Sequence, residues 1–522
     1  MNEISTGAKI EGSAASSQSD RETMRSLIDK GVEYLMPLYV DVHGIAKTKT
    51  VPVSHFDRMM RGSELFTGAA LDGLGQGPHD DELAVLPDPR AVMQLPWRPK
   101  VAVIPGQLTY HEQPYPMCSR TVLAKQIERA AKLGLKFNIG IECETYIVRR
   151  DPSAHNGIAA NDPRDTIAKA AYDASLTLLN LELLNDIVTS MNKLGWEVHS
   201  FDHEDANGQF EFDFAYADAM TMADRFVVWR LMMKELARKH GFEATMMAKP
   251  YADRTGSGAH FNMSLADVNT GKNVSGDASD KRGCGLSKRA YQFLGGLRKH
   301  AAAIVAVSCP TVNSYKRLIK TGSMTGYTWA PIFISYGGNN RTHMFRVPLL
   351  RPHIEGGDGG HSHINLSSTR WECRAVDPST NPYLAAAMFL GAGLDGIEQD
   401  LDPGDPQLVN MYELSDDELE KRGIRQLPKT LLEAVTAFEA DDLGRRVMGD
   451  ELYRSYIDLK TSEWWSYHNS ISQWEIDEYL TKFCDEGAHV FWRKKGKDAN
   501  GEVKMYFASD LPGSNVCFKK FV

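Results

Sequence analysis

The sequence predicts an α+β fold in which a small, mainly β N-terminal domain precedes a larger domain of strands and helices. Strand patterns at residues 34–53 and 101–104 support the first part. In the second part, segments 176–193, 218–240 and 288–306 show the helical spacing of apolar residues. These segments alternate with strands that carry apolar side chains on one face and polar side chains on the other. Such strands border both a core and a polar site.

The composition limits the class of protein. The chain has 522 residues, of which 42% are hydrophobic and 24% charged, as is typical of a soluble globular protein with several domains. A formal charge of −9 argues against nucleic acid or a membrane surface as a partner. No apolar run approaches the ~20 residues of a membrane span. Seven scattered cysteines without a CxxC pair indicate reduced thiols, and a cytoplasmic location is expected.

The N-terminal domain is expected over residues 21–115, after a flexible Ser-, Ala- and Gly-rich tail at residues 1–20. A short helix is expected from about Arg21 to Lys30. Residues 34–53 have the pattern of a hairpin whose turn contains Gly44. This part of the chain therefore predicts a small sheet with one or two helices.

A second, larger domain is expected over residues 116–495. It begins with a predicted helix at residues 120–132, for which Ser119 is a suitable N-cap. Residues 400–490 have a mostly helical pattern, and residues 496–522 form a C-terminal tail of polar and then aromatic composition.

Residues 140–148 contain two carboxylates in a run that otherwise predicts a buried strand. Because successive side chains on a strand point to opposite faces, Glu142 and Glu144 project side by side from one face. Ionised carboxylates are rarely packed in this way without a positive partner. Oxygen ligands suit Mg²⁺ and Mn²⁺, so the pair predicts a divalent-cation site.

Three more segments place metal- or phosphate-binding groups on one face of a strand or around a short loop. These groups are His260 with Asn262, Arg370 with Glu372 and Arg374, and the pair Glu204 and Glu211 around Gly208. A solvated strand would also alternate, but it would show Lys, Thr and Ser. Four segments of this kind together favour a shared metal and phosphate site.

These motifs, in this order, resemble the glutamine synthetase family from about residue 25 to residue 490. The segments that carry the resemblance are GIECETY (140–146), HEDANGQFEFDF (203–214), KPYADRTGSGAHFNMSL (249–265), NSYKRL (313–318), NNRTHMFRVP (339–348) and RWECRAVDPSTNPYL (370–384). The resemblance implies a β-grasp N-terminal domain and a catalytic domain of curved antiparallel sheet with flanking helices. It also implies a ring-shaped homo-oligomer, a dodecamer, with active sites between neighbouring subunits.

The resemblance implies two or three Mg²⁺ or Mn²⁺ ions in each site. The ligands that it implies for the ion nearest the glutamate substrate are Glu144, Glu204 and Glu211. The ligands that it implies for the ion nearest the phosphates of ATP are Glu142, His260 and Glu372.

The resemblance also implies roles in binding the substrates. The residues implied for glutamate are Gly256, Arg317 and Arg374, and those for the nucleotide and its phosphates are Asn262, Ser264, Arg341, Arg346 and Arg370. Arg317, Arg341 and Asp72 are the implied catalytic residues, with Asp72 facing the amine across the subunit boundary. Two alternatives remain for Asp72: it caps a turn with Gly73, or residues 80–82 carry the charge on the amine side.

The implied reaction joins L-glutamate to an amine with the use of ATP. ATP converts the γ-carboxylate, which is a poor acylating agent, to γ-glutamyl phosphate, and an amine then attacks this acyl phosphate. Metal ions and arginines would neutralise the phosphoryl oxygens, and a carboxylate would accept the proton of the amine. The products would be a γ-glutamyl amide, ADP and phosphate.

One departure from the family bears on the identity of the amine. Family members that use ammonia have a Gly-Tyr-Glu-Ala-Pro flap, whereas this chain has Trp329 near the position of that glutamate, in residues 326–331. Loss of the anion weakens an ammonium site by about 1.5–3 kcal/mol. The hypothesis is an amine that carries carbon, such as methylamine, a longer alkylamine or aniline, with Trp329 and Asp72 lining its pocket. The alternative is that another residue replaces the glutamate and the enzyme is a glutamine synthetase that uses ammonia.

Other departures leave further alternatives open. Thr255 replaces an asparagine before Gly256, which alters a glutamate contact. The expanded stretch 353–369 contains His361 and His363, which are solvated, bind a metal or line the entrance for the amine. Tyr412 falls near the position at which some relatives are adenylylated, and a packed aromatic role is predicted for it.

Two other classes of function fit the sequence less well. A phosphagen kinase would lack the paired glutamates of the predicted metal cage. A non-catalytic structural or regulatory relative would have lost metal ligands, whereas all six expected ones are present. No extra acidic cluster is clearly placed to hold the second ammonium group of a polyamine.

Overall fold

The computed structural model describes residues 18–154, 156–324, 326–349, 352–354, 362–482, 494–497 and 503–506. The described residues up to Trp464 form one compact unit, and those from Trp465 onward form a second. The expectations for residues 1–17, for His361 and for most of residues 496–522 fall outside the described residues, as do the side chains of His353 and His363. The boundaries predicted at residues 115 and 495 stay predictions.

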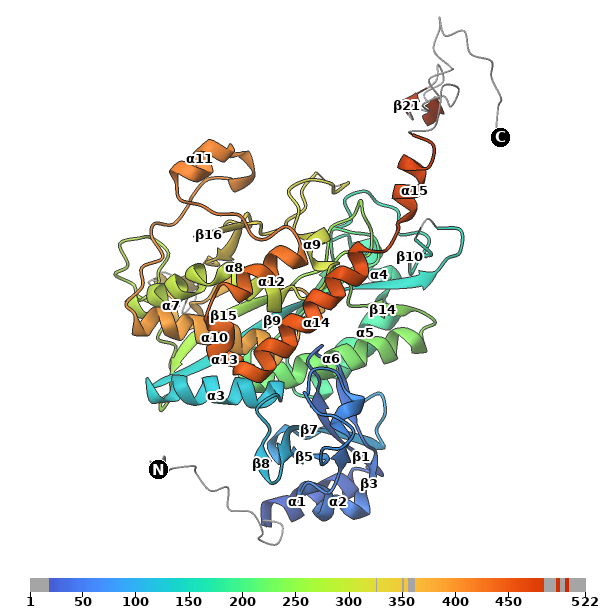
Figure 1. The fold of residues 1–522 in the computed structure, drawn as a ribbon, viewed down its shortest axis with the longest axis vertical. Coiled ribbons are helices and arrows are strands. Elements are labelled where there is room, and N and C mark those ends of the chain that lie inside the picture. Colours follow the sequence, from blue (N-terminus) through green and yellow to red (C-terminus); the bar gives the residue numbers. More distant parts are fainter. Residues whose placement is uncertain are drawn as a thin grey trace, which may run out of the picture. The chain divides into compact units, whose positions relative to one another are not determined.

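The N-terminal part is a small mixed sheet with the central strand order β2-β1-β7-β5-β4. Its strands are β1 (Tyr34–Val40), β2 (Ala46–Thr48), β3 (Val51–Pro52), β4 (Leu65–Phe66), β5 (Leu83–Pro87), β6 (Met93–Gln94), β7 (Val101–Tyr110) and β8 (Gln113–Pro114). The predicted hairpin is confirmed, because β1 pairs antiparallel with both β2 and β3. Strands β1 and β7 pair in parallel. The helices α1 (Gln18–Asp29) and α2 (Phe56–Met60) accompany this sheet in Figure 1.

The central sheet has the strand order β11-β12-β9-β15-β20-β17-β16. Its strands are β9 (Leu135–Arg150), β10 (Ile158–Ala160), β11 (Val198–His203), β12 (Gln209–Phe214), β13 (Ala217–Asp218), β14 (Glu243–Thr245), β15 (Ala259–Asp267), β16 (Phe333–Gly337), β17 (His343–Arg346) and β20 (Trp371–Cys373). Neighbours pair antiparallel except β16 and β17. Two short hairpins add β18 (Pro352–Ile354), β19 (Ser362–Ile364), β21 (Lys494–Lys497) and β22 (Val503–Tyr506).

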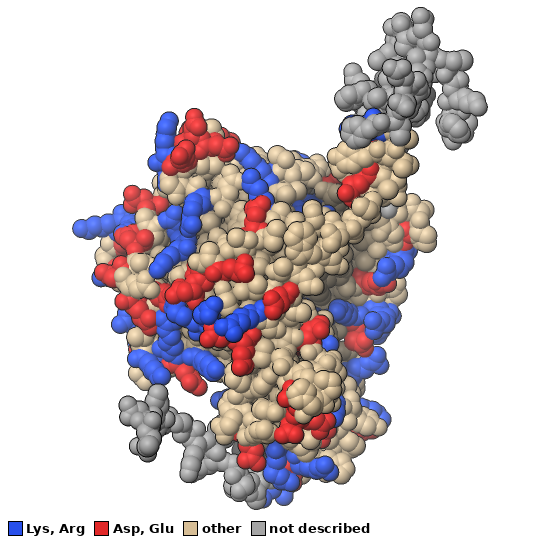
Figure 2. Space-filling model, viewed as in Figure 1, with Lys and Arg blue, Asp and Glu red and all other residues tan. Residues whose placement is uncertain are grey.

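The predicted helical segments are present, and α9 and α10 were not predicted. The described helices after the N-terminal part are α3 (Ser119–Lys132), α4 (Ala174–Leu179), α5 (Leu181–Lys193), α6 (Ala219–Lys239), α7 (Lys288–Lys299), α8 (Ala301–Ser308), α9 (Ser314–Arg317), α10 (Pro382–Glu398), α11 (Asp416–Lys421), α12 (Leu431–Glu439), α13 (Leu443–Met448), α14 (Asp450–His468) and α15 (Gln473–Tyr479). Among the described helices, none combines the length and the apolar character that a membrane crossing requires. Figure 2 shows basic and acidic side chains interspersed over the face that it displays.

Two helices predicted as continuous are interrupted by a polar residue. The segment 176–193 breaks at Asn180, whose side chain donates to the carbonyl oxygen of Leu176 at 2.9 Å. The segment 288–306 breaks at His300, which is buried and bonded to Asp441 at 2.8 Å. The side-chain amide of Asn180 competes with the helical hydrogen bonds for a backbone carbonyl oxygen. The bond of His300 to Asp441 is a tertiary contact, and the spacing of apolar residues reveals neither partner.

The prediction that Ser119 caps the first helix of the larger domain is wrong. Cys118 occupies the N-cap position, and Ser119 is the first helical residue. The hydroxyl of Ser119 donates instead to the carbonyl oxygen of Val40 in β1, at 3.0 Å. The side chain therefore joins α3 to the N-terminal sheet, a tertiary contact that has no local signature.

Buried polar contacts hold the N-terminal sheet against α3, α6 and α10. Arg120 on α3 bonds Asp88 beside the sheet at 3.0 Å and Asp224 on α6 at 3.1 Å. The hydroxyl of Tyr383 on α10 donates to Asp224 at 2.6 Å. Because a buried charge without its partner is strongly destabilising, this network fixes the position of the sheet. Figure 1 shows the N-terminal strands next to α3 and α6.

Helices α7 and α10 cover the apolar face of the central sheet. Phe137 of β9 and Trp371 of β20 both lie against Phe293 of α7, with ring centroids 5.7 and 5.0 Å apart. Phe261 of β15 lies 5.7 Å from Phe389 of α10. The apolar residues of these strands are thus buried against the helices, and the polar residues lie on the opposite face of the sheet.

We predict that Gly396→Ala destabilises the protein by about 1–3 kcal/mol, as overpacking of a core usually does. A Cβ atom at Gly396 of α10 would lie 2.0 Å from the carbonyl oxygen of Gln292 in α7. Denaturant unfolding measures the change. Gly338→Ala is the control, since no heavy atom lies within 4 Å of the added Cβ there. Equal stability of the two variants would contradict the prediction.

Candidate active site

Strand register brings the predicted ligands together on the polar face of the central sheet. Strand β9 supplies two of them and has β12 on one side and β15 on the other. The paired positions are Glu142 with His260, Glu144 with Glu211, Asn262 with Glu372, and Glu372 with Arg346. Because paired residues on neighbouring strands face the same side, these side chains converge.

Glu142, His260 and Glu372 form a group that fits a metal ion. One potential ligand atom from each lies within 4.8 Å of the others. The Nδ1 atom of His260 is 2.9 Å from Glu142 and 3.6 Å from Glu372. Burial and the nearby charge of Arg374 hold the pKa of His260 well below its usual value, so the imidazole stays neutral and can coordinate a metal. Two carboxylates and one imidazole are suitable ligands for Mn²⁺ or Mg²⁺.

A second carboxylate group surrounds Glu144. Its Oε2 atom accepts hydrogen bonds from the backbone of Gly258 at 2.8 Å and from Gln209 at 3.0 Å. Burial and the charge of Glu204 raise the pKa of Glu144 to about 8. Burial and the charges of Glu142 and Glu144 raise the pKa of Glu211 well above its usual value. Among the described residues, the ligand atoms of Glu144, Glu204 and Glu211 do not converge as those of Glu142, His260 and Glu372 do. A cation bound among them would favour their ionised forms.

Arg317 and Arg374 place two guanidinium groups beside these carboxylates. Arg374 donates to Glu372 at 2.6 Å. Arg317 lies 3.3 Å from Nε2 of His260 and donates to the carbonyl oxygen of Arg374 at 3.1 Å. Among the described residues, Nη1 of Arg317 and Nε of Arg374 are buried donors without a protein partner. Buried unpaired donors are costly, so both atoms are suited to an anionic group of a substrate.

The residues expected at the nucleotide form a chain of contacts along the same face. Arg370 donates to Asn262 at 2.9 Å, and Asn262 donates to Glu142 at 2.8 Å. Arg346 donates to both Glu372 and Asn339. This chain couples the predicted phosphate-binding residues to the carboxylates.

Ser264 and Arg341 lie further out. Ser264 follows Asn262 by two positions on β15 and is half-buried. Arg341 is exposed, and its positive charge and the negative charge of Glu204 both act on Tyr172. Arg341 therefore lies on the rim of the site.

The loop before β15 approaches Arg317 closely at Gly256. A Cβ atom there would lie 2.5 Å from the carbonyl oxygen of Ala248 and 2.6 Å from Cγ of Arg317. Only glycine fits such an approach. The preceding Thr255 is buried and donates to Gln209 at 3.4 Å, so it helps to hold the residue that supports Glu144.

Sequence reasoning missed Gln209, Asp202 and Asp213, which extend the same polar face. Burial and the charge of Glu204 raise the pKa of Asp202 to about 7, and burial and the charge of Glu142 raise the pKa of Asp213 to about 6. Gln209 and Asp213 alternate with apolar residues along β12 and share a face with Glu211, so strand periodicity could have identified these two residues.

The predicted amine-side residues lie in separate places within one chain. Asp72 is 71% exposed in the N-terminal part, where its carboxylate is 3.1 Å from His43. No hydrogen bond among the described residues joins Asp72 to the carboxylates predicted to bind metal. Trp329 is linked to them through Arg374, which donates to its carbonyl oxygen at 3.4 Å and to Glu372 at 2.6 Å. Asp81, from the alternative acidic segment, pairs with His111 at 2.7 Å in the N-terminal part.

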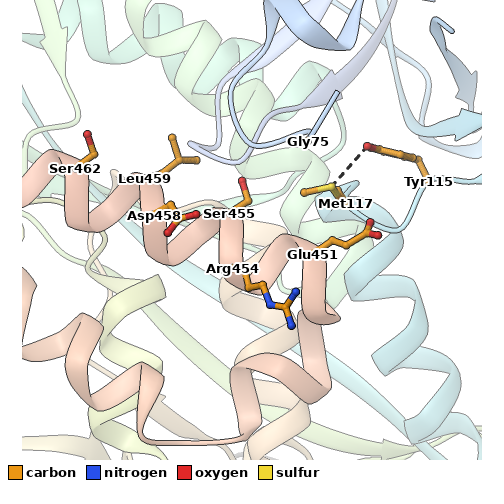
Figure 3. Close-up of a pocket in the computed structure, with 9 residues that line it drawn as sticks. All are labelled: Gly75, Tyr115, Met117, Glu451, Arg454, Ser455, Asp458, Leu459 and Ser462. Atoms are coloured by element: carbon orange, nitrogen blue, oxygen red, sulfur yellow. Dashed lines mark hydrogen bonds between the residues drawn. The ribbon is translucent and has the colours of Figure 1, made fainter. Parts of the chain in front are cut away.

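A hollow of about 640 Å³ lies between the N-terminal part and α14, as Figure 3 shows. Its lining residues are Gly75, Tyr115, Met117, Glu451, Arg454, Ser455, Asp458, Leu459 and Ser462. None of them belongs to the predicted site, so this hollow is separate from the carboxylate face.

Comparison with known proteins places the chain among related sequences and structures. The family "Glutamine synthetase, catalytic domain" matches residues 116–479. A glutamate–methylamine ligase from Methyloversatilis universalis is 38% identical over 466 residues, which cover 89% of this chain and 100% of that protein. A glutamine synthetase from Rhizobium leguminosarum bv. phaseoli is 36% identical over 452 residues, which cover 87% and 97% of the two proteins.

A solved structure of GmaS in complex with ADP matches this chain with a TM-score of 0.78. The two are 36% identical, and the match covers 88% of this chain and 99% of the GmaS chain. This likeness confirms the predicted fold class of an N-terminal β domain and a curved, mainly antiparallel catalytic sheet with flanking helices.

We predict that Glu142→Ala weakens Mn²⁺ binding more than about 100-fold. Substitution of a residue that only hydrogen-bonds to a metal ligand already lowers metal affinity by about 10- to 100-fold. Calorimetric titration with Mn²⁺ measures the affinity. Glu243→Ala is the control, since Glu243 of β14 is exposed and pairs with Arg150 of β9. Unchanged Mn²⁺ affinity in a folded Glu142→Ala protein would refute the assignment of this ligand.

We also predict that Mn²⁺ affinity rises with pH between about 6 and 8. The pKa of Glu144 is raised to about 8, so protons compete with the cation below that pH. Each proton displaced adds about tenfold in affinity per pH unit. Titrations at several pH values test this, and Glu144→Gln should flatten the dependence. A wild-type affinity that does not vary over this range would contradict the prediction.

Proposed function

The chain belongs to the glutamine synthetase family and is an ATP-dependent glutamate–amine ligase, and we propose that its amine substrate carries carbon. Candidate amines are methylamine, a longer alkylamine and an arylamine such as aniline. The observation that carries the proposal is the position of Trp329, whose carbonyl oxygen binds the same arginine that bonds Glu372. The similarity to a glutamate–methylamine ligase supports it.

We propose that two or three Mg²⁺ or Mn²⁺ ions occupy the carboxylate face. Bound there, divalent cations would neutralise the phosphate oxygens of ATP and of the acyl phosphate. Glu142, His260 and Glu372 would hold one ion, and the group around Glu144 would hold another. The raised pKa values of Glu144 and Glu211 support this assignment, because buried like charges lack sufficient positive partners.

The arginines would bind and orient the anionic groups of the substrates. Arg317 and Arg374 each have a buried donor free for a carboxylate or phosphate oxygen. Arg346 is linked to Glu372 and Arg370 to Asn262, and both would bind the nucleotide phosphates. Fixed donors of this kind stabilise charge that develops during phosphoryl transfer without reorganisation of solvent.

The proposed reaction has two steps. An oxygen of the glutamate γ-carboxylate attacks the γ-phosphorus of ATP, and ADP leaves. The amine nitrogen then attacks the carbonyl carbon of γ-glutamyl phosphate, phosphate leaves, and a base removes one proton from nitrogen. We propose Asp72 of a neighbouring subunit as that base, since its carboxylate is exposed on the N-terminal part, where it contacts His43.

The flap favours an amine with an apolar substituent. Trp329 is 40% exposed and Tyr327 is 50% exposed, and their ring centroids are 5.3 Å apart. Aromatic rings attract both apolar groups and the cationic form of an alkylamine. A flap carboxylate would instead favour bare ammonium through a charge-assisted contact.

A ring-shaped assembly is part of the proposal. An Asp72 that serves a neighbour requires sites between subunits, and a dodecamer provides them. The exposure of Asp72 on the N-terminal part is compatible with such an arrangement.

We predict that the kcat/KM for a carbon-containing amine exceeds that for ammonium by about tenfold or more. One methyl or methylene group bound in an apolar pocket changes kcat/KM by about this factor. Purified protein with ATP, glutamate and ammonium, methylamine or aniline is assayed for phosphate release and for product mass. Ammonium with the highest kcat/KM would refute the proposed substrate class and favour a glutamine synthetase.

Variants at Trp329 sharpen the comparison. Trp329→Glu introduces the flap carboxylate and should raise the kcat/KM for ammonium, relative to that for a carbon-containing amine, by about tenfold or more. Trp329→Phe retains an aromatic ring and serves as the control. Equal amine preference in both variants would show that the side chain at position 329 does not select the amine.

A further inference from the structure

The flap holds Trp329 in an unusual backbone conformation. Its φ angle is 54°, in the left-handed region. Bulky residues without glycine's freedom adopt this region only where their surroundings impose it, and such residues cluster at binding sites. The contacts around Trp329 must therefore supply the constraint.

Three hydrogen bonds fix the backbone at and beside this residue. The hydroxyl of Thr328 donates to the carbonyl oxygen of Ile319 at 2.6 Å. Arg374 donates to the carbonyl oxygen of Trp329 at 3.4 Å. The hydroxyl of Tyr412 donates to the carbonyl oxygen of Ala330 at 2.6 Å. The strained residue is thus held on both sides and at its own carbonyl group.

Tyr412 comes from a distant part of the chain and is itself rigidly placed. Its backbone nitrogen donates to the side chain of Asn410 at 3.1 Å. The neighbouring Met411 donates through its backbone to Thr342 at 3.1 Å. The ring of Tyr412 packs against Phe333, with centroids 6.1 Å apart, as predicted for a packed aromatic. Burial raises the pKa of its hydroxyl, which therefore remains a donor at neutral pH.

We propose that Tyr412 is a positioning residue that sets the amine selectivity of the site by holding the Trp329 flap in place. Its hydroxyl fixes Ala330, and Ala330 fixes the backbone that carries the Trp329 ring. Arg374 joins the same backbone to Glu372, so the flap and the carboxylate face share one guanidinium group. The kinetic consequence rests on the proposed function, whereas the structural link does not depend on it.

Release of the flap would affect one substrate more than the others. The amine would lose its aromatic wall, while the contacts of Arg317 and of the metal ligands would be unchanged. Water would also reach γ-glutamyl phosphate more easily and attack its carbonyl carbon, giving glutamate and phosphate without amide. A loosened flap therefore raises the KM for the amine and separates ATP consumption from amide formation.

Tyr412→Phe tests the proposal, because it removes one oxygen atom and keeps the ring against Phe333. Tyr456→Phe is the matched control: that hydroxyl donates to the carbonyl oxygen of Ala306 at 2.8 Å, in the helical part of the fold. Hydrogen exchange is measured by mass spectrometry on peptides that cover residues 326–337. Tyr412→Phe should speed hydrogen exchange of this peptide by about 3- to 10-fold, the factor expected for the loss of one neutral hydrogen bond. Tyr456→Phe should leave it unchanged.

Kinetics on the amine preferred by the wild type give the second readout. Tyr412→Phe should raise the amine KM by about 3- to 10-fold and increase phosphate release per amide formed, with the KM values for glutamate and ATP unchanged. Flap exchange equal to that of the wild type, or equal increases in all three KM values, would overturn the proposal. If the wild type forms no amide with any amine, the proposed function fails, and the exchange experiment still decides the role of Tyr412.

Discussion

Carboxylates crowd together on one face of the central sheet, and their charge sets a requirement for positive groups around them. Glu144 and Glu211 are buried beside other acidic groups, and their pKa values are raised as a result. Ionisation at neutral pH needs positive charge close by, which Arg317, Arg374 and bound cations would provide. The face is therefore built for charge neutralisation, and the same feature suits it to phosphoryl transfer.

The opposite face of the sheet makes this crowding tolerable. Phe261 packs against α10, and Trp371 packs against α7. The two helices approach each other so closely at Gly396 that a Cβ atom there would clash with α7. A rigid apolar layer of this kind fixes the strand register. Because register decides which side chains face each other, the packed side determines the geometry of the charged side.

The proposed amine selectivity would depend on a different kind of contact. The flap that carries Trp329 is held by single hydrogen bonds from Arg374 and Tyr412 rather than by a sheet. Loops held in this way vary readily between relatives while the scaffold stays constant. With the proposed role of the flap, this division would let one scaffold serve different amines, in line with relatives that are named glutamate–methylamine ligase and glutamine synthetase.

Strand periodicity by itself placed Glu142 with Glu144 and His260 with Asn262 on common faces. The full set of six metal-binding candidates and the fold class followed from the resemblance of an ordered set of motifs to the glutamine synthetase family. The bond of Ser119 to Val40, the interruption of a helix at His300 and the bond of Tyr412 to Ala330 became visible only in the folded chain. These contacts join residues that are distant in the chain, and local spacing carries no information about such partners.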